Sequence, residues 1–327
     1  MKLLFIGGTG IISSACSELA LARGYELYLL NRGNSKQKRP LQGAHELIAD
    51  IRNVQEVEAV IAPHSFDVVV DFISFVPEHI EQNIALFTGK TKQYIFISSA
   101  SAYQTPPQQL PITEHTPLEN PVWEYSRNKI ACEDMLLDAW KNNKFPATIV
   151  RPSHTYDKTL VPVEGGYTVI DRMLKGKPVV IHGDGSSLWT LTHHKDFAKG
   201  LIGLCGNPKS LGEAFHITSD EYLSWNRIYE LLGEALGVTP QAVYVPSTLI
   251  AKYNQSIGDS LLGDKTHSMI FDNSKIKSFV PDFACKIPFA QGAHEIIAWY
   301  KENPEYQTID ADLNSLFDML IEKMIAL

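Results

Sequence analysis

The sequence lacks long apolar runs, an excess of basic residues and closely spaced cysteines. It has 327 residues, with 29 Lys and Arg against 37 Asp and Glu, so its formal net charge is −8. An acidic balance offers no broad basic surface for nucleic acid or for an anionic membrane. Apolar runs such as residues 95–97 fall far short of the roughly 20 residues that a membrane-spanning helix requires. The apolar residues 1–6 are likewise too few for a signal peptide. We therefore expect a globular protein with no membrane or nucleic-acid partner.

Metal-binding patterns are also missing from the sequence. The chain has four cysteines with no metal-like spacing, namely Cys16, Cys132, Cys205 and Cys285. The pair His193-His194 has no evident third ligand, and adjacent residues of a strand point to opposite faces. We therefore predict no metal site. Buried free thiols are typical of a reducing compartment, which makes the cytoplasm the expected location.

The beginning of the chain has the pattern of a strand, a glycine turn and a helix. Residues 2–6 are apolar and stop at a glycine turn, after which apolar residues recur with the helical period. This unit, followed by a second apolar run at 25–30, is typical of a dinucleotide-binding domain, in which the pyrophosphate lies against a helix N-terminus. The residues predicted to bind the cofactor here are Gly7, Thr9, Gly10, Ile11 and Ile12. Ser13 replaces the usual third glycine, which loosens the motif, and an ordinary structural turn is the alternative.

The end of the second predicted strand bears on the type of cofactor. Asn31 and Arg32 stand there, without the acidic residue that would bind the adenosine ribose of NAD. Arg32 could instead pair with a 2′-phosphate, so we predict NAD(P) as the cofactor with a preference for NADP. A solvated arginine in the basic loop 32–39 is the alternative. Asp50 and Ile51 follow the next apolar run and are predicted to lie at the adenine.

Strand and helix patterns alternate through the first half of the chain. Strand-like runs stand at 68–70, 94–97 and 147–150, and helical stretches at 54–61, 78–87 and 125–140. The alternation predicts an α/β fold with a Rossmann-type doubly wound parallel sheet that helices cover on both faces. Ligands of such sheets bind beyond the carboxyl ends of the strands. Phe72, Ser98 and Pro152 follow strand ends and are therefore predicted to contact the cofactor.

The pattern changes after Pro152, where prolines and glycines punctuate short segments and helices then dominate. We expect a dinucleotide-binding Rossmann domain in residues 1–152 and a smaller, mainly helical substrate-binding region in residues 153–327. Segments near 193–218 are expected to return to the first domain. Apolar residues recur at helical spacing through 313–324, which predicts a docked amphipathic helix.

Tyr125 and Lys129 stand four residues apart, a spacing that places both side chains on one face of a helix. An ammonium beside a phenol favours the phenolate, so such a pair can move a proton near neutral pH. Taken alone, however, the pair is equally typical of the surface of any long helix.

Three motifs in chain order resemble the extended short-chain dehydrogenase/reductase family, in its NAD-dependent epimerase/dehydratase group. They are GGTGII at residues 7–12, FISSASAY at residues 96–103, and the pair Tyr125 and Lys129. Further segments resemble the same family, namely RPSHTY at 151–156, HGDGS at 182–186 and HKDFA at 194–198. The resemblance covers roughly residues 1–240.

The resemblance implies a catalytic role for Ser99, Tyr125 and Lys129. Tyr125 would exchange a proton with a substrate hydroxyl, while Lys129 lowers the pKa of the tyrosine and holds the nicotinamide ribose. Ser99 would orient the substrate oxygen. Ser101 and Tyr103, in the same segment as Ser99, are expected to contact the substrate.

Two residues of the second half also belong to the expected substrate site. His154 follows a strand end, where it would bind the substrate or act as a second acid or base, with a structural histidine as the alternative. Trp189 would stack on a sugar or base ring, with a buried tryptophan as the alternative. It stands in an apolar and aromatic run where the family commonly has an arginine for a diphosphate. The loss of that arginine also admits an unactivated sugar.

A departure from the family pattern narrows the expected reaction. Ala100 and Ser101 stand where the 4,6-dehydratases of the family carry an acid pair, so dehydration is disfavoured. We expect an NAD(P)-dependent epimerase or dehydrogenase/reductase that acts on a sugar hydroxyl, with a nucleotide sugar as the first expectation. A non-catalytic RNA-binding or regulatory member of the family is the alternative. The resemblance also implies a homodimer through the helices at 78–87 and 125–140.

Overall fold

The computed structural model describes residues 1–33 and 41–326. Its centre is a seven-stranded parallel sheet in the order β11-β6-β5-β4-β1-β2-β3. The strands are β1 (Lys2–Ile6), β2 (Glu26–Asn31), β3 (His45–Ile48), β4 (Phe66–Asp71), β5 (Thr91–Ile97), β6 (Ala147–Pro152) and β11 (Ala214–Ile217). The order reverses at β1, so the carboxyl ends of β1 and β4 flank the switch point at which ligands bind in this class of sheet.

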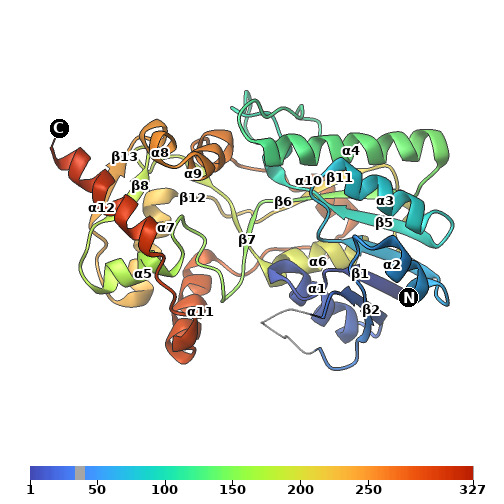
Figure 1. The fold of residues 1–327 in the computed structure, drawn as a ribbon. Helices are drawn as coiled ribbons and strands as arrows, with labels where there is room; N and C mark the ends of the chain where they lie inside the picture. Colours follow the sequence, from blue (N-terminus) through green and yellow to red (C-terminus); the bar gives the residue numbers. More distant parts are fainter. Residues whose placement is uncertain (34–40, 327) are drawn as a thin grey trace.

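Helices cover both faces of the sheet, as the sequence predicts (Figure 1). One face is covered by α1 (Ile11–Ala22), α6 (His194–Leu204) and α10 (Ser274–Phe279), and the other by α2 (Val54–Ile61), α3 (Pro77–Phe87) and α4 (Glu124–Asn143). Successive residues of a strand point to opposite faces, so Leu3 and Phe5 join one apolar core while Leu4 and Ile6 join the other. Burial on both faces explains why the strands read as continuous apolar runs.

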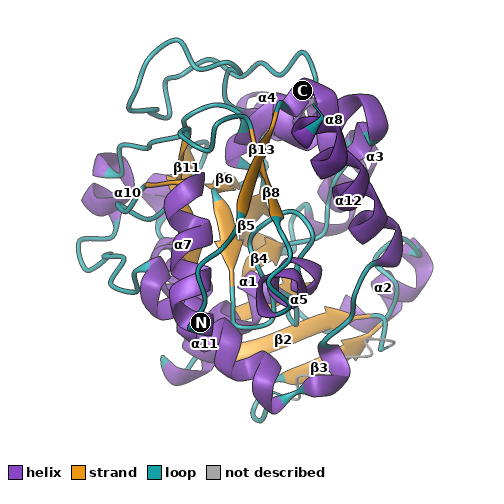
Figure 2. Cartoon of the chain, turned by 90° about the vertical axis from the view of Figure 1, so that its left-hand side faces the viewer, coloured by secondary structure: helices purple, strands orange, loops and turns teal. Residues whose placement is uncertain are grey.

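The rest of the chain builds a third apolar core beside the sheet. Its helices are α5 (Tyr167–Leu174), α7 (Trp225–Leu236), α8 (Ser247–Tyr253), α9 (Gln255–Ser260), α11 (Phe289–Glu302) and α12 (Ala311–Ile325). Its strands form three short pairs, β7 (His154–Tyr156) with β10 (Leu191–His193), β9 (Leu188–Trp189) with β12 (Leu223–Ser224), and β8 (Val179–His182) with β13 (Ala242–Val245). Figure 2 shows β8 and β13 side by side with α12 alongside them. Phe317, Leu320 and Ile321 of α12 are buried in this core, which confirms the predicted docked helix.

The chain returns to the sheet through α6 and β11, because β11 pairs with β6 at the sheet edge. The division into two domains at residue 152 stays a prediction. All four cysteines are free thiols; Cys16, Cys132 and Cys205 are buried as expected, whereas Cys285 is only half-buried. Among the described residues no helix is both long and apolar enough to cross a membrane.

Candidate functional site

The glycine turn after β1 is held in shape by Ser13. Gly7 has a φ of 84°, and a Cβ atom there would lie only 2.5 Å from Cγ2 of Ile73, so the turn requires glycine. The Ser13 hydroxyl donates to the carbonyl oxygen of Gly7 at 2.7 Å and accepts from the amide of Gly10 at 2.7 Å. Ser13, which replaces the usual glycine, therefore ties both ends of the turn together.

The turn presents the N-terminus of α1 at the carboxyl edge of the sheet. The amides of Ile11 and Ile12 begin the helix and have no acceptor within the part of the chain that the structure describes. No acidic side chain stands in this first turn, so the partial positive charge of the helix end is not offset locally. This arrangement suits the pyrophosphate of a dinucleotide.

The predicted adenosine side lies at the ends of β2 and β3. Arg32 is exposed there, and the remaining basic residues of its loop, 34–39, lie outside the described residues. The Asp50 carboxylate accepts from the amide of Arg52 at 3.0 Å. Ile51 is only 3% exposed and packs into the core of the sheet, so its side chain does not face the edge as expected.

Sequence reasoning missed Arg52, which stands directly after Ile51. One of its guanidinium nitrogens, Nη2, donates to the carbonyl oxygen of Ile73 at 2.6 Å. The other, Nη1, is buried with no hydrogen-bond partner among the described residues. Burial lowers the pKa of Arg52, the carboxylates of Asp71 and Asp50 oppose this effect, and the charge of Arg32 adds a smaller lowering. The only signal for Arg52 in the sequence was a second arginine near the predicted adenine site.

Two further predicted cofactor residues have structural contacts. Phe72, after β4, is half-buried with its ring centroid 5.4 Å from that of Phe5. The Ser98 hydroxyl, after β5, donates to Glu133, which forms a buried ion pair with Arg151. The Ser98 hydroxyl thus has a protein acceptor for its proton, and its contact with the cofactor stays a prediction.

Tyr125 and Lys129 both lie on the first turns of α4, beside the carboxyl end of β5. The ammonium of Lys129 is 5.8 Å from the ring centroid of Tyr125. It donates to the carbonyl oxygens of Ser74 at 2.7 Å and Ile97 at 2.8 Å. Burial lowers the pKa of Lys129 to about 8, against the opposing effect of the Asp71 carboxylate.

The pKa of Tyr125 is raised, which is opposite to the direction expected from a neighbouring lysine. Burial is the main cause, and the negative charge of Asp264 adds to it. A hydrogen bond with the Ser99 side chain acts in the other direction. The Lys129 ammonium does not offset the effect of burial, because it donates to two backbone carbonyls rather than to the phenol.

Ser99 is held at the end of β5 by a row of hydroxyl groups. Its Oγ is 2.9 Å from that of Ser101, which accepts from the Ser126 hydroxyl at 2.8 Å. Ser126 lies on α4 next to Tyr125. The row therefore joins the strand end to the helix that carries the tyrosine.

A cavity of about 250 Å³ opens beside Tyr125. It is lined by Ser99, Ala100, Ser101, Trp123, Tyr125, Pro152, Ser153, His154, Trp189, Thr190, Asp264, Lys265, Met269 and Phe271. The structure thus brings six predicted residues together in one cavity, namely Ser99, Ser101, Tyr125, Pro152, His154 and Trp189.

His154 and Trp189 form one unit in the wall of this cavity. The indole Nε1 of Trp189 donates to Nδ1 of His154 at 3.2 Å. Burial lowers the pKa of His154 to about 3, so the imidazole is neutral and carries its proton on Nε2. His154 is thereby a hydrogen-bond donor and not a second acid or base near neutral pH. Trp189 is only 4% exposed, so it is both buried and part of the wall.

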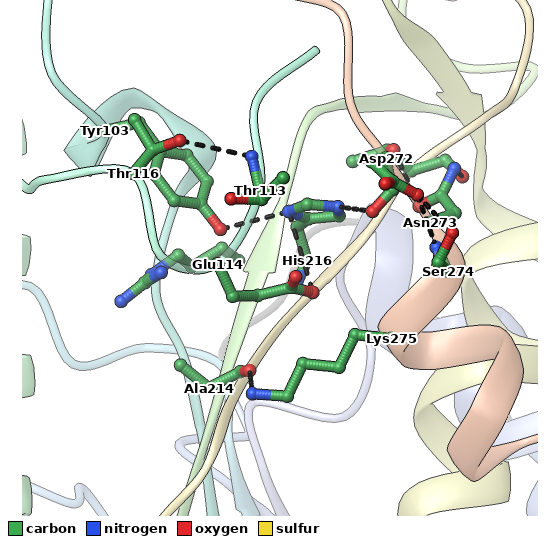
Figure 3. A network of polar contacts seen from close by, with 12 residues as sticks. Tyr103, Thr113, Glu114, Thr116, Ala214, His216, Asp272, Asn273, Ser274 and Lys275 are labelled. Atoms are coloured by element: carbon green, nitrogen blue, oxygen red, sulfur yellow. Dashed lines mark hydrogen bonds and ion pairs between the residues drawn. The ribbon is translucent and has the colours of Figure 1, made fainter.

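Tyr103 is not part of this cavity, contrary to expectation. It is completely buried, and its hydroxyl lies 3.0 Å from Nδ1 of His216 on β11. Figure 3 shows the two side chains pointing toward each other, with His216 Nε2 2.7 Å from the carbonyl oxygen of Asp272. Tyr103 therefore joins the segment after β5 to the sheet edge and does not line the cavity beside Tyr125.

Asp264 and Lys265, which sequence reasoning missed, enter the cavity from the second half of the chain. They end a π-helical turn, Leu261–Lys265. Asn120 anchors this turn, because its Nδ2 donates to the carbonyl oxygens of Gly263 at 2.7 Å and Ser101 at 3.1 Å. Neither residue stands in a recognisable motif, so no local pattern signalled them.

The histidine pair at the start of α6 has protein partners. His193 Nε2 lies 3.1 Å from the Glu295 carboxylate, and His194 Nδ1 lies 3.2 Å from the carbonyl oxygen of Ile11. Their rings are neighbours, with centroids 4.7 Å apart, because the helix begins between them. Across residues 1–33 and 41–326 no group of three or more potential ligands gathers around a metal position.

Comparison with known proteins places these features in a family. The family model described as the NAD dependent epimerase/dehydratase family matches residues 3–218. The 2′-dehydrokanamycin reductase of Streptomyces kanamyceticus is 24% identical over 287 residues, covering 86% of this chain and 80% of the relative. Chloroplast stem-loop binding protein of 41 kDa b from Arabidopsis thaliana is 27% identical over 249 residues. That match covers 72% of this chain but only 63% of the length of the chloroplast protein.

Solved structures show the same fold. The UDP-glucose 4-epimerase of Thermotoga maritima with UDP-glucose has a TM-score of 0.75 at 19% identity, covering 93% of this chain and 100% of that chain. The dTDP-glucose 4,6-dehydratase of Bacillus anthracis in complex with NAD has a TM-score of 0.74 at 21% identity, covering 93% and 98%. The family match extends over more than half of the chain and includes the glycine turn, Ser99, Tyr125 and Lys129. The chain therefore belongs to the NAD-dependent epimerase/dehydratase family.

Proposed function

We propose that this protein is an NAD(P)-dependent epimerase or dehydrogenase/reductase that acts on a sugar hydroxyl. The proposal is carried by one observation, the meeting of Tyr125 and Ser99 in the wall of one cavity, with Lys129 behind the tyrosine. Relatives and structural neighbours named for nucleotide sugars and for a kanamycin derivative support a sugar as the substrate class.

The residues divide the chemistry between them. A nicotinamide cofactor, when bound, supplies or accepts the hydride. Tyr125 takes the proton from the substrate hydroxyl, or returns it, and Ser99 holds the same oxygen by a hydrogen bond. Lys129 is fixed by two backbone carbonyls with its ammonium 5.8 Å from the centroid of the Tyr125 ring, and it would hold the nicotinamide ribose.

The turn after β1 and the edge formed by β2 and β3 suit the rest of the cofactor. The N-terminus of α1, with the free amides of Ile11 and Ile12, would hold the pyrophosphate. Arg32, which is exposed directly after β2, would hold a 2′-phosphate, which supports NADP. No carboxylate ends β2 to accept a ribose 2′-hydroxyl.

Dehydration is not part of the proposal. A 4,6-dehydratase is among the structural neighbours, but a sequence identity of 21% is evidence for a shared fold and not for a shared reaction. In this chain Ala100 and Ser101 stand directly after the catalytic serine. Neither supplies the acid and base that elimination of water requires.

Replacing Tyr125 by Phe tests the proposed function. The variant should lose turnover by roughly 10²- to 10⁴-fold, because the proton has no carrier, while its affinity for NADPH stays within about twofold. Tyr222→Phe, which changes an exposed tyrosine, should match the wild type in both measurements. The assay is a screen of sugars and nucleotide sugars that follows cofactor absorbance and product stereochemistry. An inverted stereocentre without net cofactor consumption would identify an epimerase, and net consumption a dehydrogenase or reductase. Unchanged turnover in Tyr125→Phe would contradict the role of the tyrosine.

A non-catalytic RNA-binding protein is the second candidate, favoured by the relative named as a stem-loop binding protein. The net charge of −8 of the present chain argues against RNA binding, since contacts with RNA phosphates require basic residues. Titration with NADPH and with an RNA stem-loop separates the two candidates. Binding of the RNA by a protein that binds no nicotinamide cofactor would favour the second.

The proposal extends to assembly and location. A homodimer would form through α3 and α4, which pack against each other along one face of the sheet. Light scattering at several protein concentrations tests it. The four free thiols suit the reducing cytoplasm.

A further inference from the structure

The carboxylate of Asp264 lines the cavity, and among residues 1–33 and 41–326 it has no hydrogen-bond partner. The residue is 9% exposed, and no hydrogen bond from the described part of the chain reaches its side chain. A buried carboxylate without a donor is costly, and such groups are normally paired. The donors available to this carboxylate are therefore water and the polar groups of a ligand in the cavity.

The position of Asp264 is set by the residue before it. The carbonyl oxygen of Gly263 accepts from Asn120, which also caps the start of α4 by accepting from the amide of Trp123 at 2.8 Å. A Cβ atom at Gly263 would lie 2.7 Å from Cβ of Trp123, so only glycine allows this approach. The contacts of Gly263 with Asn120 and Trp123 therefore hold the next residue, Asp264, beside the helix that carries Tyr125. That proximity is also why Asp264 affects the pKa of Tyr125.

The remaining walls combine aromatic faces with one fixed donor. Trp123, Trp189 and Phe271 supply the apolar surface. His154 supplies the donor, because its Nδ1 already accepts from Trp189 and its proton therefore lies on Nε2. Aromatic faces with a few placed polar groups match the apolar and polar faces of a sugar ring.

The charges of the cavity do not suit a diphosphate. The described lining contains no arginine, and its only cation is Lys265, because the one histidine, His154, is neutral. The Lys265 ammonium lies 3.3 Å from the Glu164 carboxylate, so its charge is largely offset. Burial raises the pKa of Asp264 to about 7, so its carboxylate adds a negative charge as the pH rises above that value, and a diphosphate would then be repelled in a site where charges are poorly screened.

We propose that Asp264 is the substrate-recognition residue of this cavity, accepting hydrogen bonds from hydroxyl or amino groups of a sugar that carries no diphosphate. The inference rests on the proposed function for its choice of a sugar. Asp264 does not take part in hydride or proton transfer; it selects the substrate.

Binding measurements with three probes test the proposal. They are methyl α-D-glucopyranoside, the corresponding 2-amino-2-deoxy glycoside and UDP-glucose, each titrated into the full-length protein and followed by calorimetry or saturation-transfer NMR. At least one simple glycoside should bind the wild type more tightly than UDP-glucose. Stronger binding of the amino glycoside would identify an ammonium as the donor, and equal binding would identify hydroxyl groups.

Variants of Asp264 supply the second part of the test. Asp264→Asn should weaken the favoured glycoside roughly ten- to hundredfold, the range for a lost charge-assisted hydrogen bond, and should not weaken UDP-glucose. Asp264→Glu keeps the charge and should keep the discrimination against UDP-glucose. Asp282→Asn, at an exposed loop position, should match the wild type.

Three results would overturn the proposal: tighter binding of UDP-glucose by the wild type, unchanged glycoside binding by Asp264→Asn, or no binding of either glycoside. A parallel NADPH titration keeps the proposed function separate. Loss of cofactor binding would count against the proposed function, whereas a wrong ligand preference in a protein that binds NADPH would count only against this inference.

Discussion

The Ser13 hydroxyl donates to the carbonyl oxygen of Gly7 at 2.7 Å while it accepts from the amide of Gly10 at the same distance. A small polar residue thus replaces the third glycine of the dinucleotide-binding motif and adds two hydrogen bonds. The turn is stabilised by its own side chain, and the motif that looked weakened in the sequence is well ordered.

Removing this hydroxyl should loosen the turn. Ser13→Ala is expected to lower the free energy of unfolding by about 1–2 kcal/mol, since two hydrogen bonds are lost and the Gly10 amide loses its acceptor. NADPH affinity should fall roughly three- to tenfold, because the turn is no longer preorganised. Chemical denaturation and fluorescence titration measure the two effects. Ser65→Ala, at an exposed position, serves as the control. Unchanged NADPH affinity would mean that the turn does not contact the cofactor.

Arg32, directly after β2, should decide between the two cofactors. Arg32→Ala is expected to weaken NADPH binding roughly tenfold and to leave NADH binding within about twofold, because only NADPH carries the 2′-phosphate. Parallel titrations with both cofactors measure the ratio. Arg23→Ala, at the exposed end of α1, should change neither affinity. Equal losses for both cofactors would leave Arg32 as an ordinary surface residue.

Asp264 should make stability depend on pH in a defined direction. Burial raises the pKa of its carboxyl from 3.8 to about 7, and Lys265 opposes this only in part. A carboxyl with a raised folded-state pKa favours folding when it is protonated. Its contribution is full below about pH 4 and is lost as the pH rises through 7. Asp264→Asn mimics the neutral form, so its stability gain over the wild type should grow by about 2–3 kcal/mol from pH 5 to pH 8. Urea denaturation of both proteins at the two pH values measures this change. A gain independent of pH would show that the carboxyl titrates as if exposed.

Local pattern was sufficient for the elements of the sheet and for part of the site. Apolar runs and helical periods predicted β1, α2 and α12 to within a residue or two, because burial imposes those periods on the residues of each element. The same reasoning placed Tyr125 and Lys129 on one helix face, as α4 has them. Local pattern did not predict which side chains form hydrogen bonds within the protein. Tyr103 and Ser98 stand in the right segment but are committed to His216 and Glu133.

The sequence by itself determined the strand, the glycine turn and the catalytic segments, since each of these depends on residues that are neighbours in the chain. Only the tertiary structure decided what faces the tyrosine. The contact between Asn120 and Gly263 joins residues 143 positions apart, and no local period records such a pairing. That contact brings Asp264 into the cavity, where the carboxylate is buried and has no hydrogen-bond donor in the described part of the chain, and its proposed role rests on these two features.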